Sequence, residues 1–91
     1  MTYKIVFTER YSRIAARFLQ RHPDMARAYV KTLALLEVNP QHPSLRLHSL
    51  GGRLPGVHSV SINLSYRITL YLLITEREIV PLNVGDHDAV Y

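Results

Sequence analysis

Apolar and polar residues in the first half of the chain predict a short strand followed by a helix. Residues 3–7 carry an aromatic or aliphatic side chain at every second position, which is typical of a β-strand. Thr8 is a suitable N-cap for a helix after it. The apolar residues that follow have helical spacing: Tyr11, Ile14, Ala15, Phe18 and Leu19. This helix is expected to end near His22, because a residue before proline avoids the helical conformation.

A second apolar stripe predicts another helix directly after the first. Pro23 suits its first turn, and Asn39-Pro40 ends it. The stripe consists of Ala26, Tyr29, Val30, Leu33 and Leu36. Because so short a turn joins them, the two helices are expected to form an antiparallel hairpin.

From residue 45 onward the apolar spacing changes to two, which predicts strands. They are expected at about 45–50, 57–64, 66–74 and 78–85, with short connections between them. Such consecutive strands form an antiparallel meander. Pro81 has no amide proton to donate, so the last strand is expected to be an edge there. We therefore predict one α+β domain over residues 1–91, with an N-terminal strand and a helical hairpin packed on an antiparallel β-sheet.

Composition narrows the possible classes of protein. The 91 residues include no cysteine, which excludes disulfides, thiolate nucleophiles and cysteine metal sites. The longest apolar run covers residues 70–74, far short of the about 20 residues that span a bilayer. No apolar signal segment occurs near the N-terminus, so we expect a cytoplasmic protein without a membrane partner.

The net charge points to a polyanionic partner. Eleven basic residues against seven acidic ones give +4, and all the basic residues except Lys4 and Lys31 are arginine. Arginine binds phosphate with a planar fork and stacks on bases, so RNA, DNA or an acidic protein fits this composition. Four arginines form a stripe on the first predicted helix: Arg10, Arg13, Arg17 and Arg21. A solvated surface and a contact with RNA or an acidic partner both explain this stripe.

The remaining candidate chemistry rests on histidine, arginine and tyrosine. The chain has no Gly-Lys-Ser/Thr or GxGxxG phosphate loop and no histidine pair with helical spacing, so neither a cofactor nor a metal is expected. Such side chains can catalyse RNA transesterification. A base takes the proton of the 2′-OH, a cation stabilises the phosphate, and an acid protonates the leaving 5′-oxygen. No metal is needed, since the nucleophile belongs to the substrate.

Arg67 is the most conspicuous candidate, because it interrupts an apolar strand. It shares a strand face with Thr69 and Tyr71, where an ion pair, solvent exposure or a phosphate contact are all possible. His48 and Arg46 share a face of an earlier strand. A solvated strand face explains those two residues equally well.

Two further candidates follow the last predicted strand. His87 lies between two aspartates, where it can reach a ligand or simply be solvated. Tyr91 lies beyond that strand and can stack on a base or orient a phosphate. His58 alternates with apolar residues, so a partly buried structural role is at least as consistent as a catalytic one.

Three segments resemble the RelE/ParE toxin superfamily, most closely its RelE/StbE and YafQ-like members. They are residues 47–56 (LHSLGGRLPG), 63–68 (NLSYRI) and 83–91 (NVGDHDAVY). The resemblance implies the RelE-like fold and a small basic toxin of a type II toxin–antitoxin module, with an acidic antitoxin as partner. RelE-like members cut mRNA in the ribosomal A site by 2′-OH attack. ParE-like members share the fold and inhibit DNA gyrase.

The resemblance also implies roles for single residues. Arg67 matches the arginine that contacts the scissile phosphate, and His87 matches a histidine proposed for acid–base catalysis. Tyr91 matches a terminal aromatic residue, and His48 matches a further active-site histidine. Arg53 falls at a basic position, so with Arg46 and the arginine stripe it is a candidate RNA contact.

The sequence also departs from the family pattern. Ser59 and Ser61 occupy positions where RelE has lysines, and Ile62 or Asn63 stands where YafQ-like chains have a histidine. These departures leave the general base open. A ribosome-dependent, metal-independent endoribonuclease, a gyrase inhibitor and a catalytically degenerate toxin that only binds its antitoxin therefore all remain possible.

Overall fold

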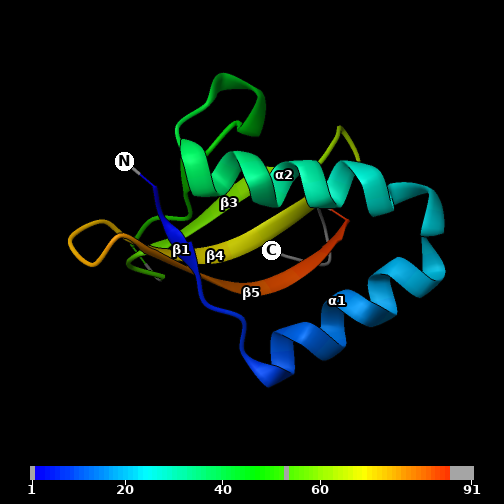
Figure 1. The fold of residues 1–91 in the computed structure, drawn as a ribbon. Helices are drawn as coiled ribbons and strands as arrows, with labels where there is room; N and C mark the ends of the chain where they lie inside the picture. Colours follow the sequence, from blue (N-terminus) through cyan, green and yellow to red (C-terminus); the bar gives the residue numbers. More distant parts are fainter. Residues whose placement is uncertain (1, 53, 87–91) are drawn as a thin grey trace.

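Two helices cover one face of a five-stranded sheet in the computed structural model, which describes residues 2–52 and 54–86 (Figure 1). The predicted order of one strand, two helices and four strands is confirmed. The elements are β1 (Lys4–Ile5), α1 (Glu9–Arg21), α2 (Ala26–Val38), β2 (His48–Ser49), β3 (Val57–Ser61), β4 (Tyr66–Leu73) and β5 (Glu78–Asp86). Short 3₁₀ turns at Pro23–Met25 and Pro43–Leu45 precede α2 and β2. In the described residues, no helix has the length and apolar character needed to cross a membrane.

The sheet is mixed, with the strand order β1-β5-β4-β3-β2. Strands β2 to β5 form the expected antiparallel meander. The N-terminal strand β1 adds a parallel pair, since Lys4 lies opposite Glu78 and Ile5 opposite Ile79. Because β1 covers only the start of β5, Pro81 has no strand on that side within the described residues. The expected edge at Pro81 is therefore confirmed.

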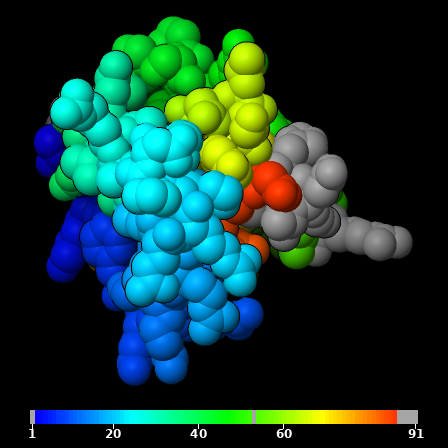
Figure 2. Space-filling model, turned by 90° about the vertical axis from the view of Figure 1, so that its right-hand side faces the viewer, coloured from blue at the N-terminus to red at the C-terminus, as the bar shows by residue number. Residues whose placement is uncertain are grey.

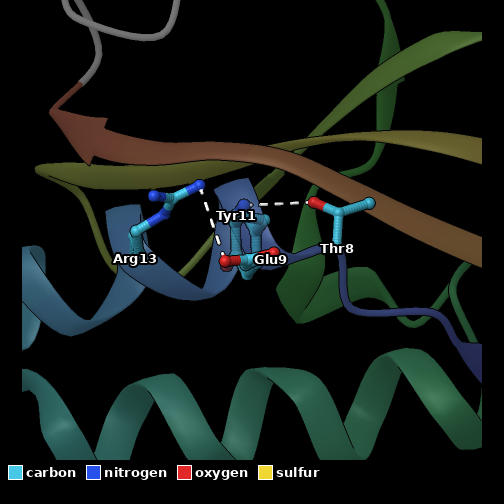
Figure 3. Close-up of polar contacts among 4 residues, drawn as sticks. All are labelled: Thr8, Glu9, Tyr11 and Arg13. Carbon is cyan, nitrogen blue, oxygen red and sulfur yellow. Dashed lines mark hydrogen bonds and ion pairs between the residues drawn. The ribbon is translucent and has the colours of Figure 1, made fainter.

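The first helix begins where the sequence predicts. The Thr8 side-chain oxygen accepts a hydrogen bond of 3.1 Å from the backbone N–H of Tyr11, as an N-cap does (Figure 3). The helix ends at Arg21, and the backbone N–H of His22 donates to the Phe18 carbonyl. Pro23 then starts the 3₁₀ turn, so the chain reverses into α2 within a few residues.

The core lies between the helices and alternate residues of the sheet. On β4, Ile68, Leu70 and Leu72 point toward the helices and are buried. The helices contribute Tyr11, Ala15, Phe18, Tyr29 and Leu36 to the same core. Because side chains of a strand alternate between faces, Arg67, Thr69 and Tyr71 lie on the opposite face, which we call the open face.

A β-bulge changes the alternation of β5. Ile79 and Val84 are both in the core although they are five positions apart. In a regular strand, residues at such an odd offset point to opposite faces. The pairing explains this: Thr69 lies opposite Asn83 but Leu70 lies opposite Pro81, so one residue of β5 is extra. Pro81 is tolerated at this irregular position, because a bulge leaves a backbone position unpaired.

Two buried tyrosines connect the helices. The hydroxyls of Tyr11 and Tyr29 lie 2.8 Å apart, and the residues are 1% and 6% exposed. Burial raises the pKa of both hydroxyls above the usual value of tyrosine, so both stay neutral. The pair satisfies two polar groups that water does not reach.

Tyr11→Phe should lower the free energy of unfolding by about 1–3 kcal/mol, because it leaves the Tyr29 hydroxyl without its protein partner. Tyr29→Phe should have a similar effect. The double variant should lose less than the sum, since neither hydroxyl then remains. Urea denaturation of all four proteins measures this coupling. Strict additivity would show that the hydroxyls contribute independently.

Candidate active site

Arg67 lies on the open face with its guanidinium fixed by the sheet. Its Nε donates to the Ser59 hydroxyl at 2.6 Å, and its Nη1 donates to the Ser61 hydroxyl at 2.7 Å. Both serines come from β3, and Ser61 lies directly opposite Arg67 in the sheet. Ser59 is fully buried, so these contacts hold the planar fork in one orientation. The strand-face prediction for Arg67 is confirmed, and its two shortest contacts among the described residues are to hydroxyls.

The register of β2 brings His48 to the same arginine. His48 lies opposite Ser59 on β3, and Ser59 in turn lies opposite Thr69 on β4. These residues therefore share the open face. The His48 Nδ1 lies 3.2 Å from Nη2 of Arg67. Two residues that are far apart in the sequence thus meet in one site.

This contact assigns the roles of the two imidazole nitrogens. A guanidinium has N–H donors and no acceptor, so Arg67 donates and Nδ1 of His48 accepts. In a neutral imidazole the proton then lies on Nε2. The lone pair of His48 faces Arg67, so Nδ1 can act as a base only when its contact with Nη2 is broken.

Arg46 contributes to the site through its backbone. Its carbonyl accepts a hydrogen bond of 3.3 Å from Nη2 of Arg67. The residue has a φ of 49° in the left-handed region, which is uncommon for a side chain other than glycine. The turn after Pro43–Leu45 therefore directs this carbonyl toward Arg67. The side chain of Arg46 is exposed.

A buried hydroxyl beside these residues has no partner. Thr69 is 5% exposed, and its Oγ1 makes no hydrogen bond. It lies between Ser59 on one side and Asn83 on the other. Buried hydroxyls are normally satisfied, so this one marks an unused donor next to the arginine site.

Comparisons with known proteins identify the fold. No protein-family model and no curated protein matches the sequence. Among solved structures, the E. coli DinJ–YafQ toxin–antitoxin complex superposes with a TM-score of 0.79 at 19% identity, over 100% of this chain and 99% of that chain. The RelBE2 toxin–antitoxin complex from Mycobacterium tuberculosis gives 0.68 at 22% identity, over 96% and 100%. A YoeB/ParE toxin from Agrobacterium tumefaciens gives 0.73 at 19% identity, over 92% and 98%.

The chain has the YafQ/RelE fold. This confirms the fold that the resemblance implied, with the parallel β1–β5 pair as an addition to the predicted antiparallel sheet. The superpositions extend over nearly the whole length of each chain.

Within this YafQ/RelE fold, the other predicted site residues fall into two groups. His87, Tyr91 and Arg53 lie outside the described residues, and their roles stay predictions. His58 is described and lies opposite Leu70 in the sheet, with its Nδ1 3.2 Å from the Gly56 carbonyl. This placement favours the structural role for His58.

The arginine stripe divides into two halves. Arg13 forms an exposed ion pair of 3.9 Å with Glu9 (Figure 3), and such a pair contributes little to stability. Arg17 and Arg21 instead line a cavity at the other end of α1. In the part of the chain that the structure describes, no group of three side chains could hold a metal ion.

Two anchoring residues were misjudged from the sequence. The sequence marks Ser59 and Ser61 only as replacements of lysines, whereas the structure shows them as partners of Arg67. Their alternation with Val60 and Ile62 was the available signal, because it places both hydroxyls on one strand face.

Proposed function

We propose that this protein is the toxin of a type II toxin–antitoxin module that cuts mRNA in the ribosomal A site. In this reaction the 2′-oxygen of the RNA forms a bond to the adjacent phosphorus, and the bond to the 5′-oxygen breaks. The products are a 2′,3′-cyclic phosphate and a 5′-hydroxyl. The contact between Arg67 and His48 on the open face carries the proposal, because it pairs a phosphate-binding cation with a candidate base.

Arg67 would stabilise the phosphate as negative charge builds up on it. A guanidinium has five N–H donors, and four are used by Ser59, Ser61, the Arg46 carbonyl and His48. The contacts through Nε and Nη1 are short and anchor the fork. The two contacts through Nη2 are longer, so a phosphate oxygen would replace the partners of Nη2 most readily while the fork stays anchored.

His48 would then act as the general base. When Nη2 of Arg67 binds the phosphate, it releases Nδ1 of His48, whose lone pair can accept the proton of the 2′-OH. Nδ1 of His48 would thus become available as a base only after a phosphate of the RNA has bound to Arg67. His87 is the proposed acid for the leaving 5′-oxygen, with Tyr91 positioning the substrate, as the resemblance implies.

An acidic antitoxin is the proposed protein partner. The net charge of +4 and the exposed Arg10 and Arg13 in the first half of α1 suit an acidic segment. The similar E. coli and M. tuberculosis structures are toxin–antitoxin complexes, which supports a partner of this kind. Such a protein would act in the cytoplasm, where ribosomes translate mRNA.

Purified protein added to programmed ribosomes tests the proposal. We expect cleavage of mRNA in the A site, with cyclic-phosphate ends, and little cleavage of the same mRNA without ribosomes. Expression should arrest growth, and a small acidic protein encoded by the neighbouring reading frame should restore it. Intact mRNA together with inhibited DNA supercoiling would instead identify a gyrase inhibitor. Antitoxin binding without either effect would identify a degenerate toxin.

A further inference from the structure

A cavity of about 340 Å³ lies at the C-terminal half of α1, outside the arginine site. Its polar residues are Arg17, Arg21, His22, Ser65, Tyr66 and Asp86, and apolar residues form the rest of the lining. Figure 2 shows this side of the molecule, where α1 (blue to cyan), the turn before β4 (yellow) and the end of β5 (red) meet. The volume is at the lower end of the range of about 300–1,000 Å³ found for small-molecule sites.

The charged groups of this cavity match a phosphate and a base together. Arg17 and Arg21 are one helical turn apart, so both guanidiniums can contact one phosphate. Asp86 contributes a carboxylate, and its two oxygens offer about four acceptor positions, enough for N–H groups of a base besides contacts within the protein. A ligand with only anionic groups would leave the acceptor positions of Asp86 without donors.

Aromatic rings form one wall of the cavity. The rings of His22 and Tyr66 have centroids 4.8 Å apart, and Phe18 packs against Tyr66 at 5.2 Å. The Tyr66 hydroxyl lies 3.2 Å from Nδ1 of His22, which fixes both rings. Rigid aromatic rings beside arginines are typical of sites that bind single-stranded nucleic acid.

The cavity and the arginine site share one end of the sheet. Tyr66 and Arg67 are consecutive residues of β4, so their side chains point to opposite faces. Tyr66 lies opposite Asp86 and Arg67 lies opposite Gly85 on β5. A single strand of RNA that crosses this end can therefore reach both sites.

We propose that this cavity binds a second nucleotide of the RNA substrate, next to the nucleotide whose phosphate reaches Arg67. Arg17 and Arg21 hold its phosphate, and Asp86 together with the His22–Tyr66 wall contacts its base. This inference rests on the proposed function and extends it, because it assigns sequence recognition to a surface separate from the residues that cleave. An acidic protein segment is the alternative occupant that the experiment must exclude.

The test compares two double variants with equal loss of charge. Arg17→Gln/Arg21→Gln removes the phosphate contacts, and Arg27→Gln/Lys31→Gln removes two exposed charges from α2 as the matched control. The probe is a fluorescent 2′-O-methyl hexaribonucleotide, which cannot be cleaved because its nucleophile is blocked. Anisotropy should show affinity reduced at least about tenfold for the first variant, against about twofold for the control. NMR signals of Ile14, His22 and Tyr66 should shift with RNA in the wild type.

Equal loss of affinity in the two variants would overturn the proposal, because only net charge would then matter. Unshifted cavity signals on saturation with RNA would also overturn it. A poly-glutamate peptide that shifts these signals when RNA does not would assign the cavity to a protein partner. Binding of this RNA needs no cleavage, so these results are independent of the ribosome assay that tests the proposed function.

Discussion

Replacing Arg67 with alanine is expected to slow mRNA cleavage on ribosomes by about 10²–10³-fold, because a preorganised cation at the phosphate acts mainly in the transition state. The loss should appear in single-turnover cleavage of a programmed mRNA. The variant also leaves the buried Ser59 hydroxyl without its donor, so the free energy of unfolding should fall by about 1–3 kcal/mol. Urea denaturation measures that loss separately.

Two further variants separate anchoring from catalysis at this position. Arg67→Lys keeps the charge but loses the planar fork, so it should recover only part of the rate. Ser59→Ala/Ser61→Ala keeps Arg67 but removes both anchors, and its rate should fall less than that of Arg67→Ala. A folded Arg67→Ala protein that cleaves at the wild-type rate would exclude the catalytic role.

Replacing His48 with glutamine should lower the cleavage rate by about 10²–10⁴-fold, because the 2′-OH then loses its general base. Glutamine can still accept a hydrogen bond from Arg67, so the arginine site should stay intact. The variant should therefore bind antitoxin and unfold in urea like the wild type. Its defect should lie in the chemical step alone.

A sulfur-substituted substrate distinguishes base from acid. An mRNA with sulfur in place of the leaving 5′-oxygen needs little protonation of the leaving group. It should restore much of the rate lost in His87→Gln and little of the rate lost in His48→Gln. The reverse pattern would exchange the two roles, and unchanged cleavage in both variants would exclude acid–base catalysis by either histidine.

Local rules of sequence predicted the elements of this fold well. Thr8 predicted the start of α1, the residue before Pro23 its end, and the change of apolar spacing predicted β3, β4 and β5. The strand expected over residues 45–50 is only His48–Ser49, because Pro43–Leu45 form a 3₁₀ turn. The same alternation placed Arg67 on the strand face away from the core. These predictions succeed because each depends on neighbours within about one turn of helix or a few strand residues.

These local rules do not predict contacts between distant segments of the chain. The proximity of His48 to Arg67 depends on the register of β2 against β3, which the expected meander alone does not determine. The parallel partner of β1 is separated from it by most of the chain. The cavity of Arg17 and Arg21 combines three segments, so the helix alone showed only a charged stripe.

The extra residue in β5 lets one strand satisfy two requirements that a regular strand could not combine. Ile79 lies before the bulge and Val84 after it, and both side chains are buried in the core that faces the helices. With a single alternation, Val84 would turn to the open face and sit beside Arg67 in place of Gly85. An apolar side chain there would occupy the space beside Arg67 that the proposed phosphate would enter. The irregularity thus leaves space beside a charged residue on the central strand of a hydrophobic sheet.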